Sequence, residues 1–190
     1  MSKAALLLLL YLAVPPGVLV DRVLAVVGKE VLTQSEFYAQ ARVALIWQKG
    51  EAAAHAPIEG ELFESLLEYV INQYLVAGEV RRLGGVFVSE KMLVERLNEF
   101  SRLFRNRNVY RAFLRRYHLS EDDLRHILRR RVRNEVFIRQ RFKLSERGRL
   151  QDPDETSKEP GKKELQEWLL TLRERSMLRV AGFDGRLETR

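Results

Sequence analysis

The sequence predicts a mainly α-helical protein with a small β element that pairs an N-terminal strand with a C-terminal strand. Three observations support this fold class. Residues 61–83 repeat adjacent apolar pairs every four positions, which is typical of a helix with one broad buried face. Most of the remaining chain shows helical apolar spacing between capping residues and glycines. Two short runs rich in β-formers, VLAVV at 23–27 and MLRV at 177–180, stand alone near the two ends.

The helix predicted over 61–83 organises the rest of the chain. Its apolar face consists of Leu62, Phe63, Leu66, Leu67, Val70, Ile71, Tyr74 and Leu75. At about 1.5–3 kcal/mol for each large side chain that becomes fully buried, the face could contribute roughly 12–24 kcal/mol of gross burial, which is an upper bound. So wide a face must be covered from more than one side, by segments that come before and after it in the chain.

The segments before this helix predict a small strand, or one arm of a tight hairpin, and one further helix. Residues 23–27 read as a strand, 28–30 as a turn and 31–32 as a short second run. Thr33 and Glu36 form a T-x-x-E capping box, which begins a helix over residues 34–47. Residues 49–60 contain Gly50, Pro57 and Gly60 and are expected to form a linker.

Three more helices are predicted after Gly84 and Gly85. Ser89 can cap a helix that runs to about residue 104, and residues 106–108 should interrupt it. Residues 109–117 form a short helix, and Ser120 with Asp123 begins a long one that extends to residue 142.

The last amphipathic segment, residues 164–176, is expected to dock on the earlier helices, because an isolated helix of this length is marginal in water. The strand that follows it lacks a neighbour in sequence, and the strand at 23–27 is the natural partner. The two ends of the folded chain would then meet in one core. The tail after Gly182 is expected to be loose.

The domain boundaries follow from composition. Residues 1–20 resemble a secretory signal, with Lys3, an apolar run over 4–14 and a Pro15-Pro16-Gly17 break, so the protein is expected to be exported. An uncleaved membrane tether and a buried N-terminal helix remain as alternatives. Residues 21–143 together with 163–181 form one helical domain. Residues 144–162 are rich in Gly, Pro and charge and are expected to be a flexible linker.

The sequence offers little for catalysis. Its 190 residues include no cysteine, which excludes disulfides, thiol catalysis and thiolate metal sites. His118, Asp122 and His126 have i,i+4 spacing, but a helix is predicted to begin between them, so polar residues around a cap explain them better than a metal site. The chain contains neither a phosphate-binding glycine motif nor H-E-x-x-H. We therefore expect a protein that is not an enzyme, with no cofactor and no bound metal.

Positive charge is concentrated in one part of the chain. Residues 100–143 hold fourteen Lys or Arg and four Asp or Glu, a net +10 within a chain of net +7. The run Arg129, Arg130, Arg131 and Arg133 could bind an anionic membrane surface or nucleic acid. The export signal argues against nucleic acid, and the preferred interpretation is a solvated cationic surface that also attracts acidic or lipid partners.

The order of segments resembles one known family, the SurA-type periplasmic chaperones. VDRVLAVVGKEVLTQSEF is similar to the family's opening strand, turn and capped helix, and EVRRLG followed by VSEKMLVERL is similar to its second and third helices. LFRNRNVYRAFLRRYHLSEDDLRHILRRRVRNEVFIRQRF resembles the next two helices, and KELQEWLLTLRERSMLRV the C-terminal helix and strand that complete the N-terminal module. The resemblance covers nearly all of the chain after residue 20.

This resemblance implies a chaperone module without catalytic residues. In the family, parvulin prolyl-isomerase domains lie where residues 144–162 stand here, and that stretch is too short for a domain. The implied function is ATP-independent binding of unfolded envelope proteins, notably outer-membrane protein precursors, in the periplasm. Candidates for a client-binding groove are apolar and aromatic residues of the amphipathic helices, although ordinary core packing explains each of them as well. They are Phe37, Ile46, Trp47, Phe104, Tyr110, Phe113 and Tyr117.

Other functions remain open at this point. A non-catalytic envelope adaptor with one fixed partner is the main alternative. A peptidyl-prolyl isomerase and a nucleic-acid-binding protein are disfavoured.

Overall fold

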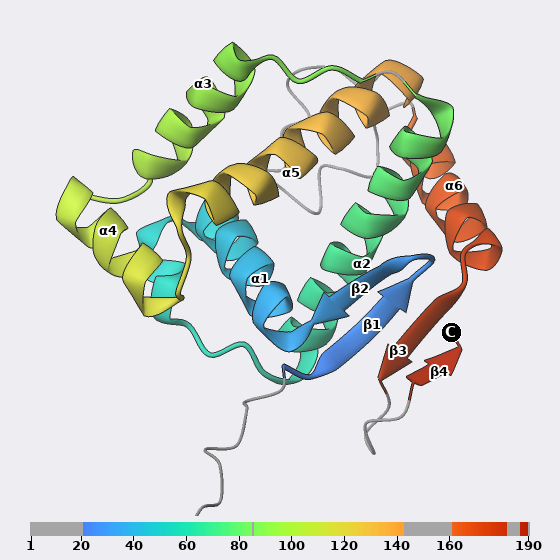
Figure 1. Ribbon diagram of the computed structural model, residues 1–190, viewed down its shortest axis with the longest axis horizontal. Helices are drawn as coiled ribbons and strands as arrows, with labels where there is room; N and C mark the ends of the chain where they lie inside the picture. Colours follow the sequence, from blue (N-terminus) through green and yellow to red (C-terminus); the bar gives the residue numbers. More distant parts are fainter. Residues whose placement is uncertain (1–20, 85, 143–160, 182–186, 190) are drawn as a thin grey trace, which may run out of the picture.

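The computed structural model describes residues 21–84, 86–142, 161–181 and 187–189, and it confirms a mainly helical chain with a small sheet (Figure 1). The expected signal over 1–20 lies outside the described residues, as do 144–160 of the expected linker. The elements in order are β1 (Val23–Val27), β2 (Glu30–Thr33), α1 (Gln34–Lys49), the 3₁₀ helix η2 (Glu51–His55), α2 (Gly60–Leu83), α3 (Glu90–Ser101), α4 (Arg107–Arg116), α5 (Glu121–Phe142), α6 (Lys162–Arg175), β3 (Leu178–Ala181) and β4 (Leu187–Thr189).

The sheet joins the two ends of the described chain, as the sequence predicts. Its strand order is β2-β1-β3-β4, and all three neighbouring pairs are antiparallel. Within the β1–β3 pair, Ala25 lies opposite Val180 and Val27 opposite Leu178. The backbone N–H of Gly28, in the turn after β1, also donates to the carbonyl of Met177 at 3.0 Å. The expected pairing of the N-terminal and C-terminal strands is therefore confirmed.

The fourth strand differs from the expectation of a loose tail after Gly182. Residues 187–189 form β4 and pair with β3, with Ala181 opposite Leu187 and Arg179 opposite Thr189. All three residues of β4 are exposed, so apolar burial does not explain the strand. Its physical role is to pair the backbone groups along the outer side of β3, which would otherwise form an open edge.

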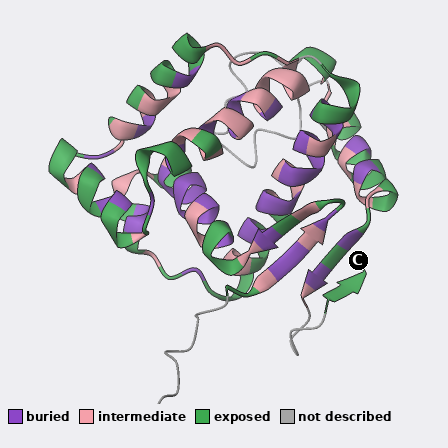
Figure 2. Ribbon diagram, viewed as in Figure 1, coloured by how far each residue is buried: buried purple, intermediate pink, exposed green. Residues whose placement is uncertain are grey.

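Helix α2 lies at the centre of the first of two hydrophobic cores (Figures 1 and 2). Six of the eight residues of its predicted apolar face are buried, and Leu62 and Phe63 are half-buried near its start. Gly84 ends the helix with a φ of 72°, a conformation that glycine adopts without strain. We call the cluster around α2 the first core. It combines buried residues of β1, β2, α1, α2, α6 and β3.

Helix α6 docks on this first core, as predicted. Trp168 and Leu172 of α6 are buried there together with Leu178 and Val180 of β3. The Trp168 ring also lies 5.9 Å from that of Phe137 in α5, centroid to centroid. The segments before and after α2 thus cover its apolar face from different sides.

A second core lies between the C-terminal half of α1, η2, α3, α4 and the first half of α5. Its centre is aromatic: the Phe100 ring lies 5.6 Å from Phe104 and 6.1 Å from Phe113. Buried aliphatic residues, Leu93, Leu124 and Leu128 among them, surround these rings. Figure 2 shows buried stretches on α3 and α4, and the buried residues Leu93 and Phe100 of α3 and Phe113 and Leu114 of α4 belong to this core.

The predicted caps are present, with two differences in the loops. Thr33 and Glu36 form the reciprocal capping box, and Ser89 accepts from the backbone of Met92. Residues 106–108 are predicted to separate two helices, with the second starting at residue 109. In the structure the Asn106 side chain accepts from the N–H groups of Asn108 and Val109, and α4 already starts at Arg107. The stretch 49–60, expected to be a linker, contains the 3₁₀ helix η2.

Candidate functional site

Five of the seven residues predicted to line a groove are buried in the cores. Phe37 belongs to the first core, and Ile46, Phe104, Tyr110 and Phe113 belong to the second. Their side chains are 0–8% exposed. Aromatic residues on amphipathic helices are suited to packing and to client binding alike, and here the folded chain has used them for packing. The prediction that these five line an open groove is therefore wrong.

The other two predicted residues, Trp47 and Tyr117, are half-buried. Trp47 stacks on Phe100 with a centroid distance of 5.8 Å, and the guanidinium groups of Arg96 and Arg131 lie 5.1 and 4.9 Å from the centre of its ring. The Tyr117 hydroxyl donates to the carbonyl of Ala54. Trp47 is thus occupied by neighbours of its own chain, whereas Tyr117 also lines an open cleft.

This opening, which we call the basic cleft, has a volume of about 760 Å³. It lies between the start of α1, the second half of α2, the turn 116–119 and the first half of α5. Its apolar wall includes Tyr38 and Tyr74, which pack with the first core, and Tyr117, Leu119 and Ile127, which pack with the second. The basic cleft is therefore the place where the two cores meet at the surface.

Cations outnumber acids in the lining of the basic cleft. The cationic residues are Arg81, Arg116, Arg129, Arg130 and Arg133, with His118 and His126 beside them, and the acidic residues are Glu36 and Asp123. A cleft lined by one sign of charge raises the local concentration of the opposite charge. The lining therefore favours anionic ligands that also carry apolar groups.

Two of these arginines are held by carboxylates. Arg81 Nη2 lies 2.8 Å from Glu30 Oε1, and Arg129 Nη2 lies 3.1 Å from Glu90 Oε2. Both ion pairs connect helices to elements outside the cleft. They position the two guanidinium groups at the rim and leave them partly exposed.

Arg130 and Arg133 differ, because no carboxylate of the described residues lies within ion-pair distance of either. Arg130 lies over the ring of Tyr74, 4.3 Å from its centre. Burial lowers the pKa of the Arg133 guanidinium, and the like charges of Arg81 and Arg130 lower it further. The buried Nε of Arg133 has no hydrogen-bond partner among the described residues. These two side chains give the cleft a positive charge that the fold does not neutralise.

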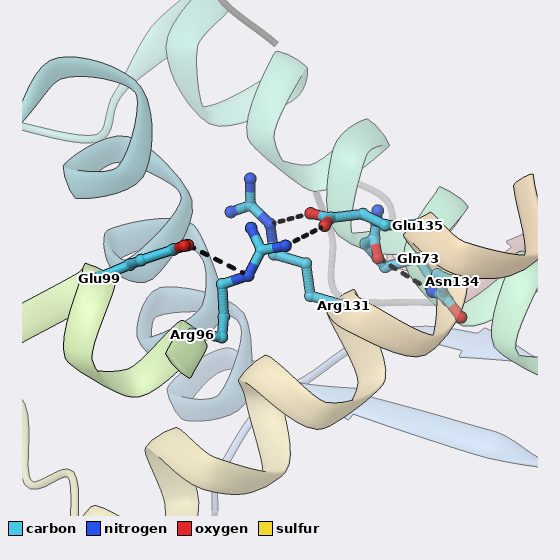
Figure 3. A network of polar contacts seen from close by, with 6 residues as sticks. All are labelled: Gln73, Arg96, Glu99, Arg131, Asn134 and Glu135. Carbon is cyan, nitrogen blue, oxygen red and sulfur yellow. Dashed lines mark hydrogen bonds and ion pairs between the residues drawn. The ribbon is translucent and has the colours of Figure 1, made fainter. Parts of the chain in front are cut away.

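The basic run 129–133 does not form one continuous surface. Arg131 is 5% exposed, and its Nε donates to Glu135 Oε1 at 2.8 Å. Arg96 donates to the other oxygen of Glu135 at 3.0 Å and lies 3.6 Å from Glu99, which completes the network in Figure 3. The prediction that Arg131 presents its charge to a membrane is therefore wrong, since its helical position points it into the protein. Arg129, Arg130 and Arg133 remain half-buried at the cleft.

A buried amide fixes α5 against α2 behind the cleft. The side-chain nitrogen of Asn134 donates to the backbone carbonyl of Gln73 at 2.8 Å and to its side-chain oxygen at 2.9 Å (Figure 3). On the cleft side, Gln40 of α1 donates to the Tyr74 hydroxyl at 3.1 Å. These bonds hold in place the helices that carry Arg130 and Arg133.

The three residues considered as metal ligands are separated as the capping pattern suggests. His118 lies in the turn before α5 with a φ of 51°, whereas Asp122 and His126 lie on the helix. Within the described ranges, no group of three His, Cys, Asp or Glu is arranged to hold a metal ion. None of the described helices combines the length and apolar character needed to cross a membrane.

Sequence reasoning missed most of the cleft. His126, Arg130 and Arg133 stand at i, i+4 and i+7, so their common helix face was readable from the sequence. Tyr38, Tyr74 and Arg81 join them only through the packing of α1 and α2, for which the sequence carries no local signal.

Comparison with known proteins adds no family assignment. No protein-family model matches the chain, and a search of curated proteins finds no significant match.

Proposed function

We propose that the protein is an ATP-independent periplasmic chaperone that binds unfolded envelope proteins, notably outer-membrane protein precursors. The observation that supports this proposal is the basic cleft, an open cavity with tyrosine and aliphatic walls at the junction of the two cores. The resemblance of the segment order to SurA-type chaperones points to the same class of function.

The composition of the cleft suits unfolded polypeptide better than a compact small ligand. Its volume of about 760 Å³ lies in the upper part of the range of ligand pockets. Unfolded strands of β-barrel proteins expose alternating apolar side chains that would otherwise pair with one another and aggregate. Aromatic and aliphatic walls can shield such side chains, while arginines at the rim contact the polar face of the same segment.

We propose binding alone, without turnover, as the mechanism. The sequence contains no phosphate-binding glycine motif, and residues 144–162 are too few for the isomerase domain of the related family. A client would bind in the cleft by burying apolar surface and would be released when it folds or inserts elsewhere. Affinity in such a cycle must be moderate, because release is not driven by nucleotide hydrolysis.

The test is suppression of aggregation. A urea-unfolded outer-membrane β-barrel protein is diluted into buffer without nucleotide, and light scattering is followed with and without equimolar chaperone. We expect scattering to fall by more than half. Unchanged scattering would contradict the proposal.

A matched pair of variants shows whether the cleft is responsible. Ala39→Trp places a large ring in the lining of the cleft, whereas Ala52→Trp adds the same ring at an exposed position in η2. We expect only Ala39→Trp to abolish the suppression. Equal activity of both variants would show that clients bind outside the cleft.

The same aggregation assay, repeated with several unrelated barrel proteins, also distinguishes a chaperone from an adaptor. An adaptor should bind one envelope protein with fixed stoichiometry and leave unrelated unfolded barrels to aggregate. A chaperone should protect several unrelated barrels.

A further inference from the structure

We propose that the basic cleft selects clients by their acidic side chains, with Arg130 and Arg133 binding carboxylates of an extended polypeptide segment. This inference rests on the proposed chaperone function and specifies the chemistry of the segment that binds. It starts from a difference between these two arginines and their neighbours.

Three neighbouring arginines each have a carboxylate partner within the fold. Arg129 pairs with Glu90, Arg131 with Glu135, and Arg81 with Glu30. Among the described residues, Arg130 and Arg133 have no such carboxylate. The two arginines that line the cleft from adjacent turns of α5 thus lack a counter-charge among the described residues, as does Arg116 at the end of α4.

Their environment favours an incoming anion. Arg133 is half-buried, and its Nε is buried without a hydrogen-bond partner among the described residues. Arg81 and Arg130 place two further positive charges near it, which with burial lower its pKa. A desolvated cation without a partner is unfavourable, so a ligand that supplies a negative charge and an acceptor gains more here than at an exposed arginine.

The geometry favours a carboxylate on a chain. Guanidinium groups bind carboxylates through two parallel N–H donors. The ring of Tyr74 lies under Arg130 and is itself held by Gln40, so this guanidinium is supported from below. Arg130 and Arg133 line the cavity from α5, while Tyr38 of α1 and Tyr117 of the turn before α5 supply apolar surface from other elements.

An extended client strand can contact both the arginines and the apolar residues of the cleft. Its successive side chains point to opposite faces, so an alternating sequence presents acids on one side and apolar groups on the other. A free inorganic anion would use only the arginines and would leave the apolar surface of the cavity without a partner. The combination of unpaired arginines and apolar walls therefore points to acidic, alternating polypeptide.

The experiment compares two fluorescent peptides of about ten residues, long enough to extend for roughly 33 Å. One alternates Glu with Val and Tyr, and the other carries Gln in place of every Glu. Binding to the full chain is measured by fluorescence anisotropy at several salt concentrations. We expect the Glu peptide to bind at least about tenfold more tightly than the Gln peptide, because charge-assisted hydrogen bonds replace neutral ones, and the difference to shrink as salt rises.

The variants use a matched change of charge. Arg130→Gln with Arg133→Gln removes two charges from the cleft, and Arg111→Gln with Arg115→Gln removes two exposed charges from α4. The first pair should weaken binding of the Glu peptide about tenfold and leave the Gln peptide within roughly twofold. The second pair should change neither peptide by more than about twofold. Arg133→Lys keeps the charge without the planar fork and should give an intermediate loss.

Several results would overturn the inference. Equal affinity for both peptides would show that the cleft does not select carboxylates. Equal weakening by both double variants would reduce the effect to the net charge of the protein. Competition by anionic phospholipid vesicles but not by unlabelled Glu peptide would assign the cleft to a membrane. If both peptides bind equally and aggregation is still suppressed, acidic selection fails while the chaperone proposal stands. If neither peptide binds and aggregation is unchanged, the chaperone proposal itself fails.

Discussion

The two cores are assembled from different kinds of segment. The first core joins residues from Leu24 to Val180 and depends on α6 and β3, which follow the rest of the domain only after the stretch 143–160. The second core lies entirely between Val43 and Leu128, so its elements are close along the chain. The first core is mainly aliphatic, whereas four aromatic residues, Phe100, Phe104, Tyr110 and Phe113, fill much of the second.

This difference explains where the candidate site lies. The two cores share α1, η2 and α5, and the basic cleft opens between α1, α2 and α5 where the cores meet. Most of the aromatic residues that were predicted to line a groove, Phe104, Tyr110 and Phe113 among them, build the second core instead. The cleft is left with tyrosines and with arginines that the fold does not pair.

The largest expected effect comes from removing the distant part of the first core. A chain that ends at residue 160 lacks four buried side chains, those of Trp168, Leu172, Leu178 and Val180. At about 1.5–3 kcal/mol each, their loss forgoes roughly 6–12 kcal/mol of gross burial, comparable with the whole stability of a domain. We expect this chain to lack a cooperative thermal transition in circular dichroism.

The matched truncation ends at residue 181 and removes β4, whose three residues are exposed. It should unfold cooperatively, within about 1 kcal/mol of the full chain. If the chain ending at 160 melts as sharply as the one ending at 181, the returning segment is not part of the core.

A cavity in the second core should give the next largest effect. Phe100 is fully buried and contacts Trp47, Phe104 and Phe113. Phe100→Ala should lower the free energy of unfolding by about 3–5 kcal/mol in urea titrations, because a large cavity remains. Phe100→Leu, which keeps most of the volume, should lose less.

Hydrogen exchange on Phe100→Ala sharpens the comparison between the cores. We expect amides of α4 to lose more protection than those of β1 and β3, since only the former belong to the second core. An equal loss in both places would show that the two cores open as one unit.

Removing the hydrogen bonds that join α5 to α2 should have a smaller effect on stability. Asn134→Ala removes two buried hydrogen bonds to Gln73 and should cost about 1–3 kcal/mol. The control Asn108→Ala changes an exposed residue of α4 and should stay within about 0.5 kcal/mol. The measurement is denaturant unfolding of both variants, and equal values would mean that the Asn134 bonds do not hold the helices together.

The smallest expected effect concerns the start of α5. The side chain of Ser120 donates to Asp123 Oδ2 at 2.6 Å, and this bond, with the backbone bond from Ser120, lowers the pKa of the Asp123 carboxyl. A lowered pKa means that the carboxylate stabilises the fold above its unfolded pKa. This contribution is lost as pH falls through the lower folded value.

Asp123→Asn should therefore cost about 0.3–1 kcal/mol near neutral pH, and the difference from the unaltered chain should shrink in acid. Asp122→Asn removes the same charge from the first turn without a hydrogen bond to Ser120, and it should lose less. Thermal melts at several pH values measure both. If the stability difference between Asp123→Asn and the unaltered chain grew in acid, the pKa of Asp123 would not be lowered in the folded state.

The topology of the first core was predictable because the N-terminal strand and the C-terminal helix and strand each needed a partner from a distant part of the chain. The strand at 177–180 has no neighbour in sequence, and the helix before it is too short to be stable alone, so both had to pack on the earlier part of the chain. Strand β4 was not predictable, because Leu187, Glu188 and Thr189 carry neither alternation nor a buried side chain.

The candidate site was less predictable than the fold. Helical spacing shows that Phe104, Tyr110 and Phe113 share an apolar face, but it does not tell whether that face packs on the chain or on a client. In the same way, four arginines in one run look alike until the helix turns Arg131 inward and Arg130 and Arg133 toward the cleft. Which cations remain unpaired depends on Glu30, Glu90 and Glu135, residues far from one another in sequence.

The central claim is that clients bind in the cleft at the junction of the cores, and site-specific photo-crosslinking tests it most directly. The photoreactive residue p-benzoylphenylalanine replaces either His126, an exposed residue of the cleft lining, or Phe87, which is 84% exposed outside the lining. With an unfolded barrel protein as client, we predict covalent adducts from position 126 and few from position 87. Equal adducts from both positions, or adducts from position 87 alone, would contradict the account.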